Sequence, residues 1–278
     1  LKDWQALFII EGIPAVILGI LTWFWLIDHP DQAKWLTERE KYIVKTSLNA
    51  EQRAVTDDKS TFKTIFMDPR VHIMGFVFLC IYSGTNTITY WVPTLIKEFG
   101  VADIQKIGLL SSLPYLFALI AMYLLCRSSD KYLERRWHLA LTMGVGSISF
   151  MLLGQVQHDL TLSVLLLTVG CGACFSAATL FWTIPPAYLS LTTAALGIAW
   201  INVMGSMAAA ISPALVGFVK TQTGSIYLAF GVIGALLIVG AILLLVVIPA
   251  RLIKKKKNVQ DQYAGQTENI ATSEMHSK

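Results

Sequence analysis

The sequence predicts an all-α integral membrane protein: a six-helix bundle preceded by one further helix and a central loop. Of its 278 residues, 55% are hydrophobic and only 14% are charged, with a mean hydropathy of +0.59. A soluble domain normally carries about 25% charged residues. Because the bilayer core offers no hydrogen-bond partners, the backbone of an apolar spanning segment has to satisfy itself as a helix.

Seven segments have the length of about 20 mostly apolar residues that a membrane span requires. They are residues 5–26, 72–95, 107–126, 138–157, 161–183, 196–218 and 226–249.

Basic residues fall almost entirely on one side of this topology. Alternate connections hold 18 of the 22 Lys and Arg residues, and the opposite side holds four. By the positive-inside rule, loop 27–71, loop 127–137 and the C-terminus are expected in the cytoplasm of a multi-pass protein of the inner (plasma) membrane. The expected domains are a helix over 1–26, a cytoplasmic loop over 27–71, a six-helix bundle over 72–250 and a disordered tail over 251–278.

The central loop contains one helix signal of its own. Thr37 is followed three residues later by Glu40, which is the spacing of a capping box. A helix is therefore predicted from Thr37 to about Arg53, with an apolar face suited to the inner membrane surface.

Helix breakers occur at corresponding places in the bundle. Segment 72–95 contains Gly84 and Pro93, and segment 161–183 contains Gly170 and Gly172 before a Pro-Pro pair. Breakers in matching spans point to a transporter binding site near the middle of the membrane.

Polar and aromatic side chains within the spans are candidates for binding a small organic solute. Asn86 lies one turn from two tyrosines on one helix face, and an amide at that depth needs hydrogen-bond partners. The alternative role for such residues is contact between helices. The substrate-binding candidates are Tyr82, Asn86, Tyr90, Tyr115, Trp182, Asn202 and Ser206.

Ionisable residues are missing from the centres of the last six spans, and Glu11 in the first span is the one candidate for carrying a proton. Its alternative role is a hydrogen bond to a neighbouring helix. The sequence has no phosphate loop and no H-E-x-x-H motif, so no enzyme activity, cofactor, metal site or nucleic-acid partner is expected. The four cysteines, Cys80, Cys126, Cys171 and Cys174, are interpreted as packing residues.

The short basic segment 127–136, RSSDKYLERR, resembles the D-R/K…R-R signature of the major facilitator superfamily. Four further stretches resemble its anion:cation symporter family, in particular bacterial tartrate, phthalate and hydroxyphenylacetate permeases. They are WQALFIIEGIP (4–14), KWLTEREK (34–41), YSGTNTITYWVPTLIKE (82–98) and FWTIPPAYLS with AALGIAWIN (181–202).

The resemblance implies a C-terminal portion, helices six to twelve, of a permease that imports a small organic carboxylate with a proton. It also implies a missing N-terminal half, which agrees with a chain that opens on Leu1 and enters a span at once. The family signature is matched by Asp130, Arg135 and Arg136. The resemblance implies a gating role for these three residues. Glu134 stands where glycine is common, and glycine is the residue that permits the tight turn of the signature.

Two other interpretations stay open from the sequence. The same topology suits a seven-helix membrane receptor. That architecture does not explain the loop of 45 residues after the first span or the D-K…R-R segment. An inactive, truncated permease remnant would retain the same residues by descent.

Overall fold

The structure is a computed structural model that describes residues 3–56, 66–189 and 191–247. The chain divides into two compact units. Residues 3–56 are the described part of the first unit, and residues 66–189 and 191–247 are the described part of the second. The expected tail over 251–278 and part of the expected central loop lie outside the described residues.

The first unit consists of α1 (Asp3–Trp25), a short 3-10 turn η1 (Pro30–Gln32) and α2 (Glu38–Thr56). α1 is apolar all round and its described side chains are largely exposed within this unit. A helix with that surface requires lipid or other protein around it.

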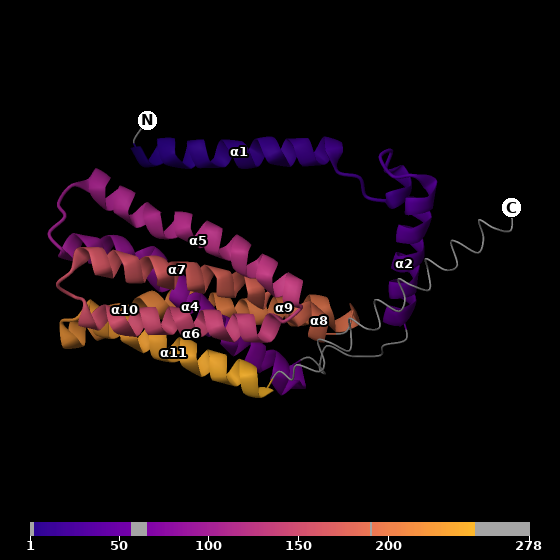
Figure 1. Ribbon diagram of the computed structural model, residues 1–278. Coiled ribbons are helices and arrows are strands. Elements are labelled where there is room, and N and C mark those ends of the chain that lie inside the picture. Colours follow the sequence, from indigo (N-terminus) through magenta and orange to yellow (C-terminus); the bar gives the residue numbers. More distant parts are fainter. Residues whose placement is uncertain (1–2, 57–65, 190, 248–278) are drawn as a thin grey trace, which may run out of the picture. The chain divides into compact units, whose positions relative to one another are not determined.

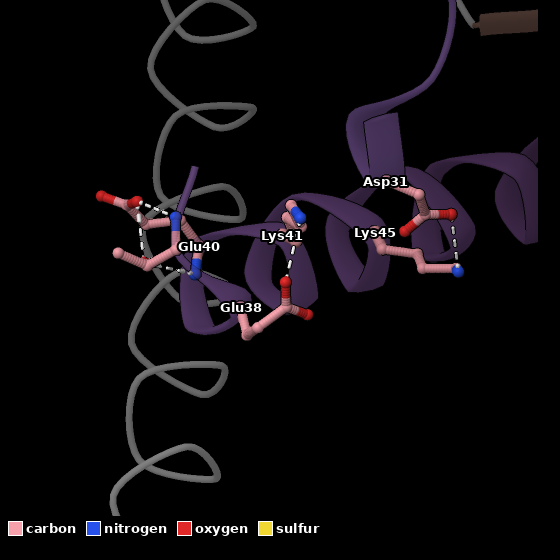
Figure 2. A network of polar contacts seen from close by, with 6 residues as sticks. Asp31, Glu38, Glu40, Lys41 and Lys45 are labelled. Carbon is pink, nitrogen blue, oxygen red and sulfur yellow. Dashed lines mark hydrogen bonds and ion pairs between the residues drawn. The ribbon is translucent and has the colours of Figure 1, made fainter. Parts of the chain in front are cut away.

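The capping box at the start of α2 is present as the sequence predicts (Figure 2). The Glu40 carboxylate accepts from the Thr37 backbone N–H at 2.9 Å and from its hydroxyl at 2.8 Å. Lys45 forms an ion pair with Asp31 at 3.0 Å, which joins α2 to η1. The helix starts where expected and continues past Arg53 to Thr56.

The second unit contains the remaining helices, drawn from purple to yellow in Figure 1. They are α4 (Pro69–Glu98), α5 (Ile104–Tyr132), α6 (Arg135–Leu152) with the 3-10 turn η2 (Leu153–Gln155), α7 (Leu160–Phe181), α8 (Pro185–Tyr188), α9 (Leu191–Ser206), α10 (Ala208–Thr223) and α11 (Ile226–Val247).

Seven helical segments of the described chain are long and apolar enough to cross a membrane, with α9 and α10 together forming one. The predicted all-α membrane fold is therefore confirmed. Three spans begin after an aspartate whose side chain accepts a hydrogen bond from a backbone N–H of the first helical turn: Asp68 before α4, Asp103 before α5 and Asp159 before α7. Such caps satisfy amide groups that the helix itself leaves free.

Helix α4 is the central element of the bundle. It packs against α7, α9, α10 and α11, while α6 packs against α7 and α11, and α5 packs mainly against α7. In α4, 67% of the most apolar 18-residue window is buried, against 11% in α5. The core contains Phe78, Phe150, Phe181 and Phe230, all fully buried.

The expected helix breaks at the glycines are absent, because α4 and α7 run through these residues without interruption. A Cβ on Gly84 would lie 2.8 Å from Cys174 Sγ, and one on Gly170 would lie 2.8 Å from the Phe150 ring. The glycines therefore permit close approach of neighbouring helices, which is the common use of small residues in membrane helices.

The ten-residue basic loop is also shorter than expected. Helix α5 continues through Arg127 to Tyr132, and α6 starts at Arg135. The turn is made by Leu133, the one described non-glycine residue with a positive φ, at 54°. The turn is thus made one residue before Glu134, the position where the family signature commonly has glycine. Leu133 takes the left-handed conformation that glycine adopts more easily.

Candidate functional site

A cavity of about 480 Å³ lies between α4 and α7. It is lined by uncharged side chains, most of them aromatic or hydroxyl-bearing. They are Tyr82, Thr85, Asn86, Thr89, Phe175, Ala178, Thr179 and Trp182. A concave, largely apolar surface with a few polar groups is the usual form of a small-molecule site.

The polar groups of the cavity are held by their own helices. Asn86 Nδ2 donates to the Tyr82 carbonyl at 2.8 Å, and the Thr85 hydroxyl donates to the same carbonyl at 3.0 Å. Thr89 and Thr179 likewise donate to carbonyl oxygens one turn earlier, at 2.9 and 3.0 Å. The hydroxyl oxygens therefore retain acceptor capacity, and Asn86 retains its carbonyl oxygen and one N–H for a ligand.

Aromatic rings build the apolar part of the wall. Phe78 lies 4.5 Å from the Tyr82 ring and 4.8 Å from the Trp182 ring, centroid to centroid, so a buried phenylalanine supports two lining residues. Tyr115 of α5 meets Phe175 edge to face at 5.7 Å. These edge and tilted contacts are the favoured geometries of aromatic pairs and hold the wall in place.

The structure brings only part of the expected substrate set together. Tyr82 and Asn86 of α4 and Trp182 at the end of α7 line the cavity, and Tyr115 reaches it through Phe175. Tyr90 lies one turn beyond Asn86 and is 57% exposed.

Asn202 and Ser206 of α9 are exposed and are not among the lining residues. Their role in binding stays a prediction. Thr85, Thr89 and Thr179 line the cavity and were absent from the expected set. Each lies three or four residues after another lining residue of the same helix (Tyr82, Asn86 and Phe175, respectively), and this helical spacing was the signal that could have found them.

A second polar cluster lies at the turn between α5 and α6. Arg135 Nη2 is 3.8 Å from Asp130 Oδ1, and Arg135 Nη1 donates to the Thr183 carbonyl at 3.0 Å. Arg136 donates to the Leu245 carbonyl near the end of α11. The two arginines therefore reach the C-terminal ends of α7 and α11.

Basic side chains are favoured at such helix ends, because the last carbonyl groups are unpaired and carry partial negative charge. The cluster consequently ties one end of four helices together. Glu11, the candidate proton carrier, belongs to the other unit and is exposed on α1.

Comparison with known proteins agrees with this architecture. The family model described as Major Facilitator Superfamily matches residues 1–197 and 102–273. The chain belongs to the major facilitator superfamily. It is accordingly a multi-pass membrane protein, and the superfamily consists of transporters.

Individual relatives are transport proteins by name. The chain is 36% identical to a candidate tartrate transporter of Agrobacterium vitis over 88% of this chain and 56% of that protein. It is 33% identical to NicT of Pseudomonas putida, named as a candidate metabolite transport protein, over 92% of this chain and 58% of that protein. It is 31% identical to a quinolone resistance transporter of Acinetobacter baumannii, over 89% and 57% respectively. The chain spans little more than half the length of these relatives.

Proposed function

We propose that this chain forms one wall of the transport pathway of a permease for a small organic carboxylate. The observation that carries the proposal is the cavity between α4 and α7, whose lining combines the Asn86 amide with three threonine hydroxyls and three aromatic rings. The name of the Agrobacterium relative supports a carboxylate as the solute.

The lining favours an aromatic carboxylate over a sugar acid. Tyr82, Phe175 and Trp182 offer ring faces and edges to a planar ligand. None of the lining residues is charged, and a carboxylate buried without a positive partner would be costly. The carboxylate group is therefore expected to face the part of the pathway contributed by the other half of the permease.

We further propose proton symport, with Glu11 as the residue that carries the proton. It is the one acidic residue within the first span, and membrane carboxylates commonly serve as proton relays. The distribution of Lys and Arg supports a location in the inner membrane with the C-terminus in the cytoplasm. Asp130, Arg135 and Arg136 would then hold the cytoplasmic ends of the helices together in one state of the transport cycle.

The test is uptake into proteoliposomes containing the full-length permease, with labelled 4-hydroxyphenylacetate and tartrate compared under an inward proton gradient. Asn86→Ala should lower kcat/KM about ten-fold, because roughly 1.4 kcal/mol of hydrogen bonding to the solute is lost. Thr87→Val is the matched control, since Thr87 is buried on the same helix and bonded to the Ser83 carbonyl, outside the cavity.

Equal kcat/KM values for N86A and T87V at equal expression would exclude this cavity as the substrate site. Failure to transport either acid, with the fold intact, would exclude the proposed substrate class. Uptake that stays dependent on the proton gradient in Glu11→Gln would remove Glu11 from the coupling role.

A further inference from the structure

His72, in the first turn of α4, uses both ring nitrogens in hydrogen bonds. Its Nδ1 lies 3.2 Å from the indole Nε1 of Trp200 on α9, and its Nε2 lies 2.8 Å from the carbonyl oxygen of Phe66. The Phe66 and Trp200 rings are also in contact, with centroids 4.6 Å apart. Phe66 and His72, six residues apart, thus join the start of α4 to Trp200 on α9.

The partners determine the protonation state of this imidazole. An indole N–H can only donate, so His72 Nδ1 has to accept and cannot carry a proton. The single ring proton is therefore on Nε2, where it is donated to the Phe66 carbonyl. Both bonds exist together only with the neutral ring.

A second proton on His72 would break this arrangement. It would sit on Nδ1 and face the Trp200 N–H, so that two donors would oppose one another across the helix interface. The positive ring would also lie in the first turn of α4, where the helix dipole disfavours positive charge. The protonated imidazole consequently requires Trp200 to move away.

Few charged side chains on the helices packed against α4 could offset a positive charge on His72. The helical residues of α7, α9 and α11 contain no Asp, Glu, Lys, Arg or His, and Lys220 of α10 pairs with Glu98 at the far end of α4. The described charged or titratable residues at the same end of the bundle are Asp68 and Arg70 beside the start of α4, Arg127, Asp130 and Lys131 on α5, and Glu134, Arg135, Arg136 and His138 at the start of α6. Trp200 is the cross-helix partner that His72 contacts directly.

We propose that His72 and Trp200 form a proton-sensitive contact that holds the start of α4 against α9 while the imidazole is neutral and releases it when the imidazole takes up a proton. The two helices also pack through Gly75 against Met204 and through Gly205 against Phe78. Release would therefore free the first turn of α4 while the rest of the interface stays packed.

The experiment measures the Tm of the purified protein in detergent at about pH 7.5 and about pH 5.5. His72→Gln is the informative variant, because its amide can accept from Trp200 and donate to Phe66 but cannot take up a proton. Acidification should lower the Tm of the wild-type protein by about 2–4 °C more than that of H72Q, the range expected for one hydrogen bond in a domain of this size. Equal pH shifts in the two proteins would overturn the proposal.

Trp200→Phe supplies an independent readout that does not depend on H72Q folding. It keeps an aromatic ring and removes the N–H, so its Tm should lie below wild type at about pH 7.5 and approach it at about pH 5.5. A wild-type advantage that persists undiminished at the lower pH would contradict the proposal. Both measurements are of stability, so their outcome is independent of the proposed substrate and transport activity.

Discussion

The Arg135 guanidinium donates to the carbonyl oxygen of Thr183, 3.0 Å away and 48 positions further along the chain. Thr183 follows directly on the last turn of α7, so this contact places a positive charge at the negative end of a helix dipole. The ion pair of the same guanidinium with Asp130 is longer, at 3.8 Å, and the Asp130 side chain is 70% exposed. The link to the helix end is therefore the stronger of the two interactions of Arg135.

Substitution at this turn should separate the two interactions. Arg135→Ala should lower the free energy of unfolding by about 1–2 kcal/mol, because a charge-assisted bond to a helix carbonyl is lost. Asp130→Asn should cost less than about 0.5 kcal/mol, since an exposed ion pair contributes little. Denaturation of the purified R135A and D130N proteins measures both changes in the free energy of unfolding. A loss in D130N as large as that in R135A would instead make the ion pair the dominant contact.

The interface between α4 and α9 should not tolerate a methyl group at Gly205. A Cβ there would lie 2.0 Å from Phe78 Cδ1, and Phe78 is fully buried against Phe181 and Trp182. Gly205→Ala is expected to destabilise the protein by about 1–3 kcal/mol through overpacking. Because Phe78 supports the cavity wall at Tyr82, substrate affinity should fall in the same variant.

Gly144→Ala is the control for this substitution. Gly144 lies within α6, and a Cβ built on it meets nothing within 4 Å. The change should be neutral or stabilise the helix by up to about 1 kcal/mol, as alanine does relative to glycine in a helix interior. Thermal unfolding of both variants in one detergent gives the comparison, and equal losses of stability would argue against the close approach at Gly205.

The start of α2 should be sensitive to pH through Glu40. Hydrogen bonds from the Thr37 backbone and hydroxyl lower the pKa of this carboxyl group below its usual value. A lowered pKa in the folded state means that the ionised form stabilises the helix. That contribution is complete above the ordinary glutamate range and is lost as the pH falls through the lowered pKa.

Circular dichroism of a peptide covering residues 34–56 should therefore show helicity that decreases on acidification. In Glu40→Gln this component of the pH dependence should disappear, since an amide can still accept from Thr37 but does not titrate. A pH profile unchanged by E40Q would indicate that other carboxylates of the segment control the helix.

Much of this fold could be predicted because its determinants are local. Length and hydropathy define each span, since a helix satisfies its own backbone wherever the bilayer excludes water. The Thr37 and Glu40 spacing located the start of α2 for the same reason: both partners lie within one helical turn. Asn86 and Tyr82 could be placed on one face of α4 because they are one turn apart.

Relationships between distant segments could not be obtained in this way. The sequence shows Gly84 and Gly170 only as potential breaks, whereas the packed helices show each glycine facing a side chain of another span. The sequence likewise places Asn202 at membrane depth, and only the rotation of α9 leaves it exposed and apart from the cavity lining.

The membrane spans, the start of α2 and the polar residues of each span were thus determined by the sequence itself, through backbone satisfaction and local hydrogen bonds. The pairing of α4 with α7 around a cavity, the reach of Arg135 to Thr183 and the contact of His72 with Trp200 were decided by tertiary structure. These features depend on which helix faces meet, and that choice follows from packing among residues far apart in the chain.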